Sequence, residues 1–256
     1  MSLSFKFGTV GSPIGTPKKP GGSVGAIEFS NSIGLDALEL GWVQSVRVTE
    51  ATCAAIKLAG EAQGVALSVH APYFINLNAT DEEWPKSRKR LMDAAHYGYL
   101  AGATDIIFHP GSYFGNDPAE VLKVAIPRLE GCVKELQKNG DIVTLRPETM
   151  GKSAMLGSAE DAIAMSKAMD MVQPCLDFAH LHARPGDGTM NTYDEWSRLL
   201  ENHLPLADAD LDLKALFKAM HAFECAGRIL CESPIMEEDA LNMKKVWMKV
   251  SGEKGK

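Results

Sequence analysis

Strand-like and helix-like segments alternate along almost the whole of this 256-residue chain. Each short apolar run rich in β-branched or aromatic residues is followed by a loop with Gly or Pro and then by a segment of helical periodicity. The strand candidates are Phe5–Gly8, Ala37–Leu40, Ala66–Val69, Asp105–Phe108, Ile142–Leu145, Gln173–Leu176 and Arg228–Leu230. This alternation is typical of a parallel sheet covered by helices, either a closed barrel or an open doubly wound sheet.

Several helix starts between these strands carry capping signals. Thr80-Asp-Glu-Glu83 has the pattern of a capping box, and Asp117-Pro-Ala-Glu120 places a proline in the first helical turn, where its missing N–H is tolerated. Two later helical patterns cover Thr192–Leu200, which also begins with a capping signal, and Leu213–Phe223. These signals support a repeated strand–helix unit.

These patterns favour an α/β fold, a (β/α)8 TIM barrel, built as a single domain of residues 1–256. The chain has neither a G-x-G-x-x-G motif after a strand nor a P-loop motif, which disfavours the nucleotide-binding open sheets. A closed barrel needs eight strands, and the seventh is missing between Leu200 and Leu213. Two hypotheses remain: either residues are absent from the sequence near Leu200–His203, or the chain is a truncated relative.

Composition and charge narrow the function classes. Hydrophobic residues make up 45% of the chain and no apolar run is long enough to cross a bilayer, so we expect a cytoplasmic protein with no membrane contact. Five cysteines without paired spacing argue against a disulfide framework. The formal net charge of −7 argues against non-specific coating of nucleic acid.

Side chains of metal-binding types lie at or just beyond the ends of several strand candidates. They are His70, His109, Glu148, Asp177, His180 and Glu232. In a parallel barrel the C-terminal ends of all strands meet at one opening, here called the mouth, where active sites are built. Imidazoles and carboxylates without cysteine suit Zn²⁺, Mn²⁺ or Fe²⁺. Glu39, inside the second strand, is either a structural carboxylate or a further residue of the mouth.

Bound cations would also change the charge argument. Carboxylates packed together repel one another, and divalent cations relieve that repulsion. Three such ions would add six positive charges to the net charge of −7 and leave −1. An acidic composition is therefore compatible with an anionic substrate.

Five segments occur in one order along nearly the whole chain. They are Val69-His70-Ala-Pro-Tyr73, Phe108-His109-Pro-Gly-Ser112, Pro147-Glu148-Thr-Met-Gly151, Cys175-Leu-Asp177-Phe-Ala-His180 and Cys231-Glu232-Ser-Pro. Together they resemble the endonuclease IV family of apurinic/apyrimidinic endonucleases, within the xylose isomerase-like barrels. The resemblance implies a zinc-dependent hydrolase of DNA repair that cuts the phosphodiester 5′ of an abasic site.

The same resemblance implies up to three zinc ions, with Mn²⁺ or Fe²⁺ as alternatives. His70, His109 and Glu148 would bind one metal, and Glu148 would bridge to a second metal held by Asp177 and Glu232. His180 and His203, the latter within Glu201-Asn-His203, would bind the third. Glu148 and Glu232 are the expected catalytic residues, because they would hold the nucleophile between metals. The family also has a histidine at the end of strand seven that has no counterpart here.

Double-stranded DNA with abasic sites is the implied partner, bound by a monomer. Tyr73 and Phe74 are placed to wedge into the gap left by the missing base, although Phe74 could instead pack inside the barrel. Lys18 and Lys19 in the first loop, and Arg184 after the sixth strand candidate, are candidate phosphate contacts. The alternative for these three cationic side chains is simple solvation.

Two other functions fit the same barrel. A sugar isomerase or epimerase would use one or two Mn²⁺ or Mg²⁺ ions held by carboxylates, and the number of imidazoles here argues against it. A relative that binds damaged DNA without cutting it is the other alternative. The missing histidine of strand seven is its only support.

Overall fold

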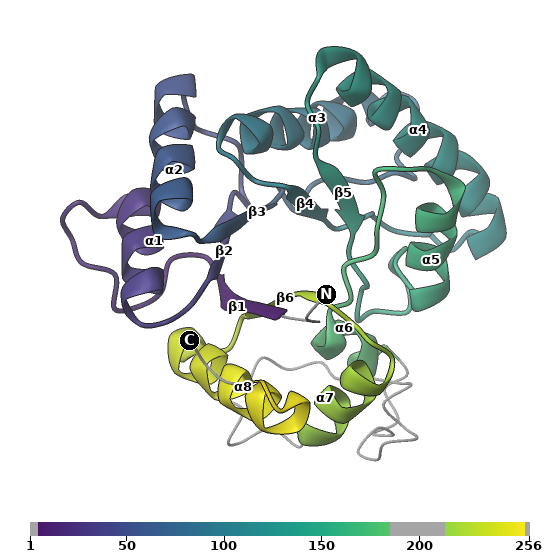
Figure 1. Cartoon of the computed structure of the whole chain (residues 1–256). Helices are drawn as coiled ribbons and strands as arrows, with labels where there is room; N and C mark the ends of the chain where they lie inside the picture. Colours follow the sequence, from purple (N-terminus) through teal and green to yellow (C-terminus); the bar gives the residue numbers. More distant parts are fainter. Residues whose placement is uncertain (1–4, 185–212, 254–256) are drawn as a thin grey trace.

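The computed structural model describes residues 5–184 and 213–253. Within them, parallel strands form a six-stranded sheet in the order β5-β4-β3-β2-β1-β6 (Figure 1). The strands are β1 (Phe5–Val10), β2 (Ala37–Gly41), β3 (Ala66–His70), β4 (Asp105–Phe108), β5 (Thr144–Pro147) and β6 (Gly227–Cys231). All pairings are parallel, so the C-terminal ends of the strands lie at one edge.

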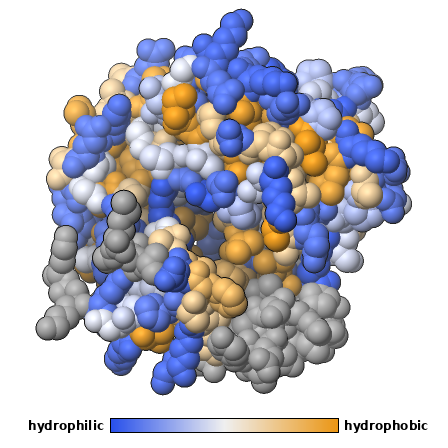
Figure 2. Space-filling model, turned by 45° about the vertical axis from the view of Figure 1, so that its right-hand side comes forward, coloured by the Kyte–Doolittle hydropathy of each residue, from blue (hydrophilic) through white to orange (hydrophobic). Residues whose placement is uncertain are grey.

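Helices connect the strands and cover the outer face of the curved sheet (Figure 1). They are α1 (Gly22–Ser32), α2 (Glu50–Gln63), α3 (Trp84–Leu100), α4 (Pro118–Asn139), α5 (Ala159–Ala168), α6 (Phe178–Ala183), α7 (Leu213–Ala222) and α8 (Met236–Ser251). Among the described residues, none of these helices is both long and apolar enough to cross a membrane. On the face drawn in Figure 2, hydrophilic residues cover much of the surface and hydrophobic side chains gather in patches between them.

The sixth strand candidate is where the expected pattern fails. Val172 and Cys175 make isolated parallel bridges with Leu145 and Glu148, so Gln173–Leu176 lies along β5 without forming a regular strand. Gln173 and Cys175 donate to the carbonyls of Leu145 and Pro147 in β5, but Pro147 has no N–H to donate back to this segment, which explains the interruption. The prediction of a strand there was wrong, although the segment takes the place that the next barrel strand would occupy.

The capping predictions had mixed outcomes. Asp117 caps α4, because its carboxylate accepts from the N–H groups of Ala119 and Glu120. Thr80 does not cap α3: this helix begins at Trp84, and the Thr80 hydroxyl instead accepts from the Glu83 N–H in the preceding turn. The predicted helix Thr192–Leu200 lies outside the described residues.

A partly buried charge network shows how strongly the sheet is curved. Arg228 of β6 forms an ion pair with Asp105 of β4 and donates from Nη1 to the Leu67 carbonyl of β3 at 2.9 Å. In strand order β6 lies three positions from β3 and four from β4, which would be roughly 14–19 Å in a flat sheet. No arginine side chain spans that distance. The contact therefore requires a sheet rolled toward a barrel.

Arg146 of β5 also pairs with Asp105, so two guanidinium groups share one carboxylate at the N-terminal ends of the strands. Burial alone would raise the pKa of Asp105, but Arg228, Thr104 and Arg146 together hold that pKa below its usual value. Below this network and outside the sheet, Trp247 of α8 packs edge-on against Phe5 of β1 with 4.8 Å between ring centroids. This network lies at the N-terminal ends of the strands, so the residues of the candidate site lie at the opposite, C-terminal end of the sheet.

Candidate metal centre

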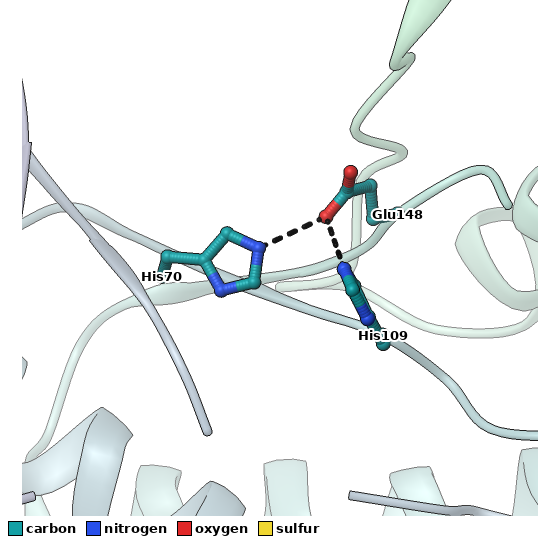
Figure 3. A group of neighbouring side chains, drawn as sticks. All are labelled: His70, His109 and Glu148. Atoms are coloured by element: carbon teal, nitrogen blue, oxygen red, sulfur yellow. Dashed lines mark hydrogen bonds and ion pairs between the residues drawn. The ribbon is translucent and has the colours of Figure 1, made fainter. Parts of the chain in front are cut away.

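Three neighbouring strands deliver side chains to one point at the mouth. His70 is the last residue of β3, His109 follows β4 directly, and Glu148 follows β5 directly. His70 Nε2 lies 3.2 Å from Glu148 Oε2, and His109 Nε2 lies 3.4 Å from the same oxygen (Figure 3). Both imidazoles therefore point at one carboxylate oxygen of Glu148, a residue that is only 3% exposed.

The other oxygen of Glu148 faces a second group. His180 Nδ1 lies 3.0 Å from Glu148 Oε1 and 3.1 Å from Asp177 Oδ2. Asp177 is also the N-cap of α6, where its Oδ1 accepts from the His180 N–H at 2.8 Å. Thr149 orients this cap, since its hydroxyl accepts from the Asp177 N–H and donates to the Asp177 carbonyl. A capping motif therefore places both ligand-type side chains.

The donor atoms of both groups fit a metal ion. In His70–His109–Glu148 and in Glu148–Asp177–His180, one donor atom from each residue lies within 4.8 Å of the others. Donor atoms around a tetrahedral zinc ion lie roughly 3.3 Å apart, so small rotations would close either group on a cation. The donor set of nitrogen and oxygen suits Zn²⁺, Mn²⁺ or Fe²⁺. Glu148 belongs to both groups.

The carboxylates of the site stabilise positive charge on the groups next to them. Burial alone would raise the pKa of Glu148, but hydrogen bonds from His109, His180 and His70 hold it well below its usual value. Burial opposes the charged form of His70, yet Glu148 raises the pKa of His70 to about 9. In the same way Asp177 and Glu148 raise the pKa of His180 to about 11 against the effect of burial. Without a metal, protons provide the charge that a cation would otherwise supply.

Glu39 is the residue whose role could not be decided from its local sequence. It lies within β2, 2% exposed, and accepts a 2.8 Å hydrogen bond from Ser68 Oγ. Burial raises the pKa of Glu39 to about 7 against the opposing charge of His70 and the hydrogen bond from Ser68. Glu39 belongs to neither of the two three-residue groups. A carboxylate between two leucines, as in Leu38-Glu39-Leu40, is the sequence feature that could have pointed to its burial.

Tyr73 packs directly on His70 and His109. Its ring stacks on His109 with 4.9 Å between centroids and meets the edge of His70 at 5.2 Å. Glu232 follows β6 and lies outside both three-residue groups. Burial is the largest cause of the raised pKa values of Tyr73 and Glu39, and the charge of Glu232 raises both of them further. Glu232 is therefore near the centre electrostatically, while its role as a metal ligand stays a prediction.

The predicted DNA contacts differ in their surroundings. Phe74 is 58% exposed and does not pack inside the barrel; the Arg90 guanidinium lies 5.8 Å from its ring centroid. Lys18 and Lys19 are exposed in the loop that follows β1. Arg184 has a structural part, because its guanidinium donates to the carbonyls of Met150, Lys152 and Met155 and to the Tyr113 hydroxyl. Phosphate contact by Arg184 and the two lysines stays a prediction.

The third expected metal cannot be followed in the described part of the chain. His203, Glu201 and the place where residues were suspected missing all lie outside the described residues. His180, which was assigned to the third metal, here contacts Glu148 and Asp177 of the second group. Its assignment to a third metal stays a prediction, and so does the single-domain organisation.

Residues 27–249 match the model of the xylose isomerase-like TIM barrel family. The chain belongs to this family. Membership confirms the predicted TIM-barrel fold, of which the described residues form a curled parallel sheet with its helices.

Relatives of this xylose isomerase-like barrel protein include proteins named as endonucleases. It is 28% identical over 271 residues to an uncharacterized protein of Methanocaldococcus jannaschii, across 94% of this chain and 96% of that protein. It is 30% identical over 174 residues to endonuclease 4 of Thermus thermophilus, across 63% of this chain and 60% of that protein. The second of these matches supports the resemblance to endonuclease IV.

Solved structures extend the similarity over nearly the full chain. A D-tagatose 3-epimerase-like protein superposes with a TM-score of 0.72 at 16% identity, covering 97% of this chain and 98% of that one. Endonuclease IV from Thermus thermophilus superposes with a TM-score of 0.68 at 24% identity, covering 95% and 99%. At these identities the similarity shows the fold. The fold is thus shared with proteins described as a D-tagatose 3-epimerase-like protein and as an endonuclease.

Proposed function

We propose that this protein is a zinc-dependent apurinic/apyrimidinic endonuclease that hydrolyses the DNA phosphodiester 5′ of an abasic site. The observation that carries the proposal is the pair of metal-binding groups joined by Glu148. Because the two groups share Glu148, they could hold two divalent cations that together neutralise charge on one phosphate. The partial identity to endonuclease 4 of Thermus thermophilus supports the same activity.

Each residue of the centre has a defined part in this reaction. His70, His109 and Glu148 would hold one cation, and Glu148, Asp177 and His180 the next. A bound divalent cation supplies a Lewis acid that neutralises charge on the phosphate oxygens. Tyr73 holds the His109 ring by stacking, which keeps the imidazole turned toward Glu148. Glu148 and Glu232 would orient the attacking water.

Selectivity would come from the missing base. An abasic nucleotide has no stacked base, so turning it out of the helix costs less than turning out an intact nucleotide. Tyr73 stands beside His70 and His109, and the exposed ring of Phe74 follows it in the chain, so both could fill the gap in the duplex. Hydrolysis would break the bond between phosphorus and the 3′-oxygen of the preceding nucleotide, leaving a 3′-hydroxyl and a 5′-deoxyribose phosphate.

A sugar epimerase is the second candidate function. Glu39 supports it, because a buried carboxyl with a pKa of about 7 is suited to proton transfer near neutral pH. The structural similarity to the D-tagatose 3-epimerase-like protein agrees with this fold-level alternative. Three imidazoles around Glu148 favour the phosphodiesterase.

The test measures metal content and cleavage together. We expect the zinc-loaded protein to contain at least two zinc ions by plasma emission and to nick a duplex with one tetrahydrofuran abasic analogue. This analogue has no aldehyde and cannot undergo β-elimination, so a nick reports hydrolysis, and extension by a polymerase would confirm the 3′-hydroxyl. Glu148→Gln should lose metal and reduce nicking at least 100-fold, because its carboxylate joins both groups.

His96→Ala is the matched control for histidine loss. His96 also pairs with a buried carboxylate, Asp141 at 3.0 Å, but lies in α3 at the N-terminal ends of the strands. This variant should keep its metal and its activity. Epimerisation of D-tagatose without any nicking would favour the second candidate, and metal-loaded protein that neither binds nor cuts the duplex would refute the proposal.

A further inference from the structure

Phe114 presents an exposed ring from a strained backbone position at the mouth. It lies in the loop between β4 and α4, five residues after His109, and its side chain is 65% exposed. Its φ of 53° falls in the left-handed region, which is a rare conformation for a bulky aromatic residue. Strained residues of this kind persist where surrounding contacts hold them, and they concentrate at functional sites.

Hydrogen bonds hold the backbone at Phe114 and at the two residues before it. The Ser112 hydroxyl accepts from the Phe114 N–H at 3.2 Å and donates to the Ala154 carbonyl at 3.1 Å. The adjacent Tyr113 is buried, and its hydroxyl donates to Asp161. Phe114 is therefore an exposed ring on an anchored loop, and among the described residues no aromatic or cationic group packs on its face.

The same loop is joined to the one that carries Tyr73 and Phe74. Asn78 donates from Nδ2 to the carbonyls of Ser112 and Tyr113 at 3.0 and 3.3 Å. The loops after β3 and β4 therefore form one hydrogen-bonded unit that flanks the metal centre. We call Tyr73, Phe74 and Phe114, the exposed aromatic residues of this unit, the aromatic rim.

We propose that Phe114 is a stacking platform for a nucleobase that borders the abasic gap, an inference that rests on the proposed function. Loss of one base leaves the faces of neighbouring bases open, and an aromatic ring stacks on any base without reading its sequence. A ring on an anchored loop loses little conformational entropy on binding. The aromatic rim would then contact the gap through two loops, with Tyr73 and Phe74 on one and Phe114 on the other.

Substitutions at this position separate the ring from the backbone. Phe114→Ala removes the ring and keeps the left-handed strain, whereas Phe114→Gly removes both, because glycine adopts positive φ freely. Phe114→Trp keeps an aromatic platform. Phe223→Ala is the matched control, since Phe223 is 79% exposed but follows α7 and precedes β6, away from the mouth.

The measurement is single-turnover nicking of the tetrahydrofuran duplex over a range of zinc-loaded protein concentrations. Phe114→Ala and Phe114→Gly should raise the half-saturating concentration about tenfold, which corresponds to ~1.4 kcal/mol, with little change in the maximal rate. Phe114→Trp and Phe223→Ala should match the wild type. A substitution that only impaired folding would not raise the half-saturating concentration while leaving the maximal rate unchanged.

A second readout reports stacking directly. The fluorescence of 2-aminopurine falls when the base stacks, so it is placed opposite the tetrahydrofuran in one duplex and next to it in another. The wild type should quench at least one probe more strongly than Phe114→Ala does. Nicking by the wild type with no effect of Phe114→Ala on either readout would overturn this inference alone. Wild type that neither nicks nor binds, or Phe114-dependent binding of D-tagatose in place of DNA, would refute the proposed function and this inference together.

Discussion

Two buried carboxylates at the same mouth have pKa values that move in opposite directions. Glu148 receives three imidazoles, and these outweigh burial and keep it ionised. Glu39 receives one hydroxyl hydrogen bond from Ser68, so burial dominates and its pKa rises to about 7. The number of donors around each group therefore decides how completely each carboxyl group is ionised at neutral pH.

Glu39→Gln should stabilise the metal-free protein at pH 8 and have a much smaller effect at pH 5. The folded-state pKa of Glu39 lies above its unfolded value of 4.5, so its contribution to stability is present below pH 4.5 and is lost as pH rises through about 7. Glutamine stays neutral throughout. The difference in the free energy of unfolding between variant and wild type should change by about 2 kcal/mol between pH 5 and pH 8.

Urea denaturation in the presence of a chelator at the two pH values measures this effect. Glu82→Gln, at an exposed residue before α3, is the control and should show no such pH dependence. A Glu39→Gln effect that is the same at both pH values would contradict the assignment of a buried, protonated carboxyl.

At the scale of elements, charge pairs close the end of the sheet that lies opposite the metal centre. Asp105 of β4 joins Arg146 of β5 to Arg228 of β6, strands that stand at the two ends of the sheet order. Apolar packing between sheet and helices permits a range of curvatures. A carboxylate shared by two arginines requires the two ends of the sheet to approach each other.

Asp105→Asn should destabilise the protein by about 2–3 kcal/mol, because two partly buried guanidinium groups would lose their counter-charge. Denaturant unfolding at pH 7 measures the loss. Asp81→Asn is the matched control, since Asp81 also pairs with an arginine, Arg128, but its side chain is fully exposed. Equal effects of the two substitutions would show that the network does not hold the sheet closed.

At the scale of the whole molecule, the proposed function requires an acidic protein to bind an acidic polymer. The formal net charge is −7, so long-range attraction to DNA has to come from bound cations and from local basic residues at the mouth. Lys18 and Lys19 are exposed in the loop after β1, at the end of the barrel where the metal centre lies. Under the proposed function we expect these two lysines to make sequence-independent phosphate contacts.

Replacing Lys18 and Lys19 together with alanine should weaken duplex binding and reduce its salt dependence. Each phosphate contact contributes about −0.9 to the slope of log K against log salt, so the double variant should lose close to two units of slope if both lysines make one. Fluorescence anisotropy at several salt concentrations gives the slope. The control replaces Lys123 and Lys134, both exposed on α4, and an equal slope change in the two double variants would contradict the assigned contacts.

Local patterns were enough to find most strands and the ligands that follow them. β2, β3 and β4 begin where alternation placed them, and His70, His109 and Glu148 follow adjacent strands at the same edge. Parallel pairing makes that edge common to all strands, so the convergence of the three side chains could be predicted. Local reading failed at Gln173–Leu176, because Pro147 of β5 has no N–H to donate to this segment and the ladder between them is interrupted.

The sequence by itself determined the strand–helix order, the parallel sheet and the residue types at the mouth, because these depend on periodicity and on near neighbours in the chain. Only the tertiary structure decided that Glu39 is buried with a raised pKa, that Arg184 braces neighbouring loops, and that Phe114 stands exposed at positive φ. Each of these depends on partners or surroundings distant in the chain, such as Ser68 for Glu39 and the loop after β5 for Arg184. Burial and hydrogen bonding between distant segments are set when the sheet curls, and no short stretch of sequence records them.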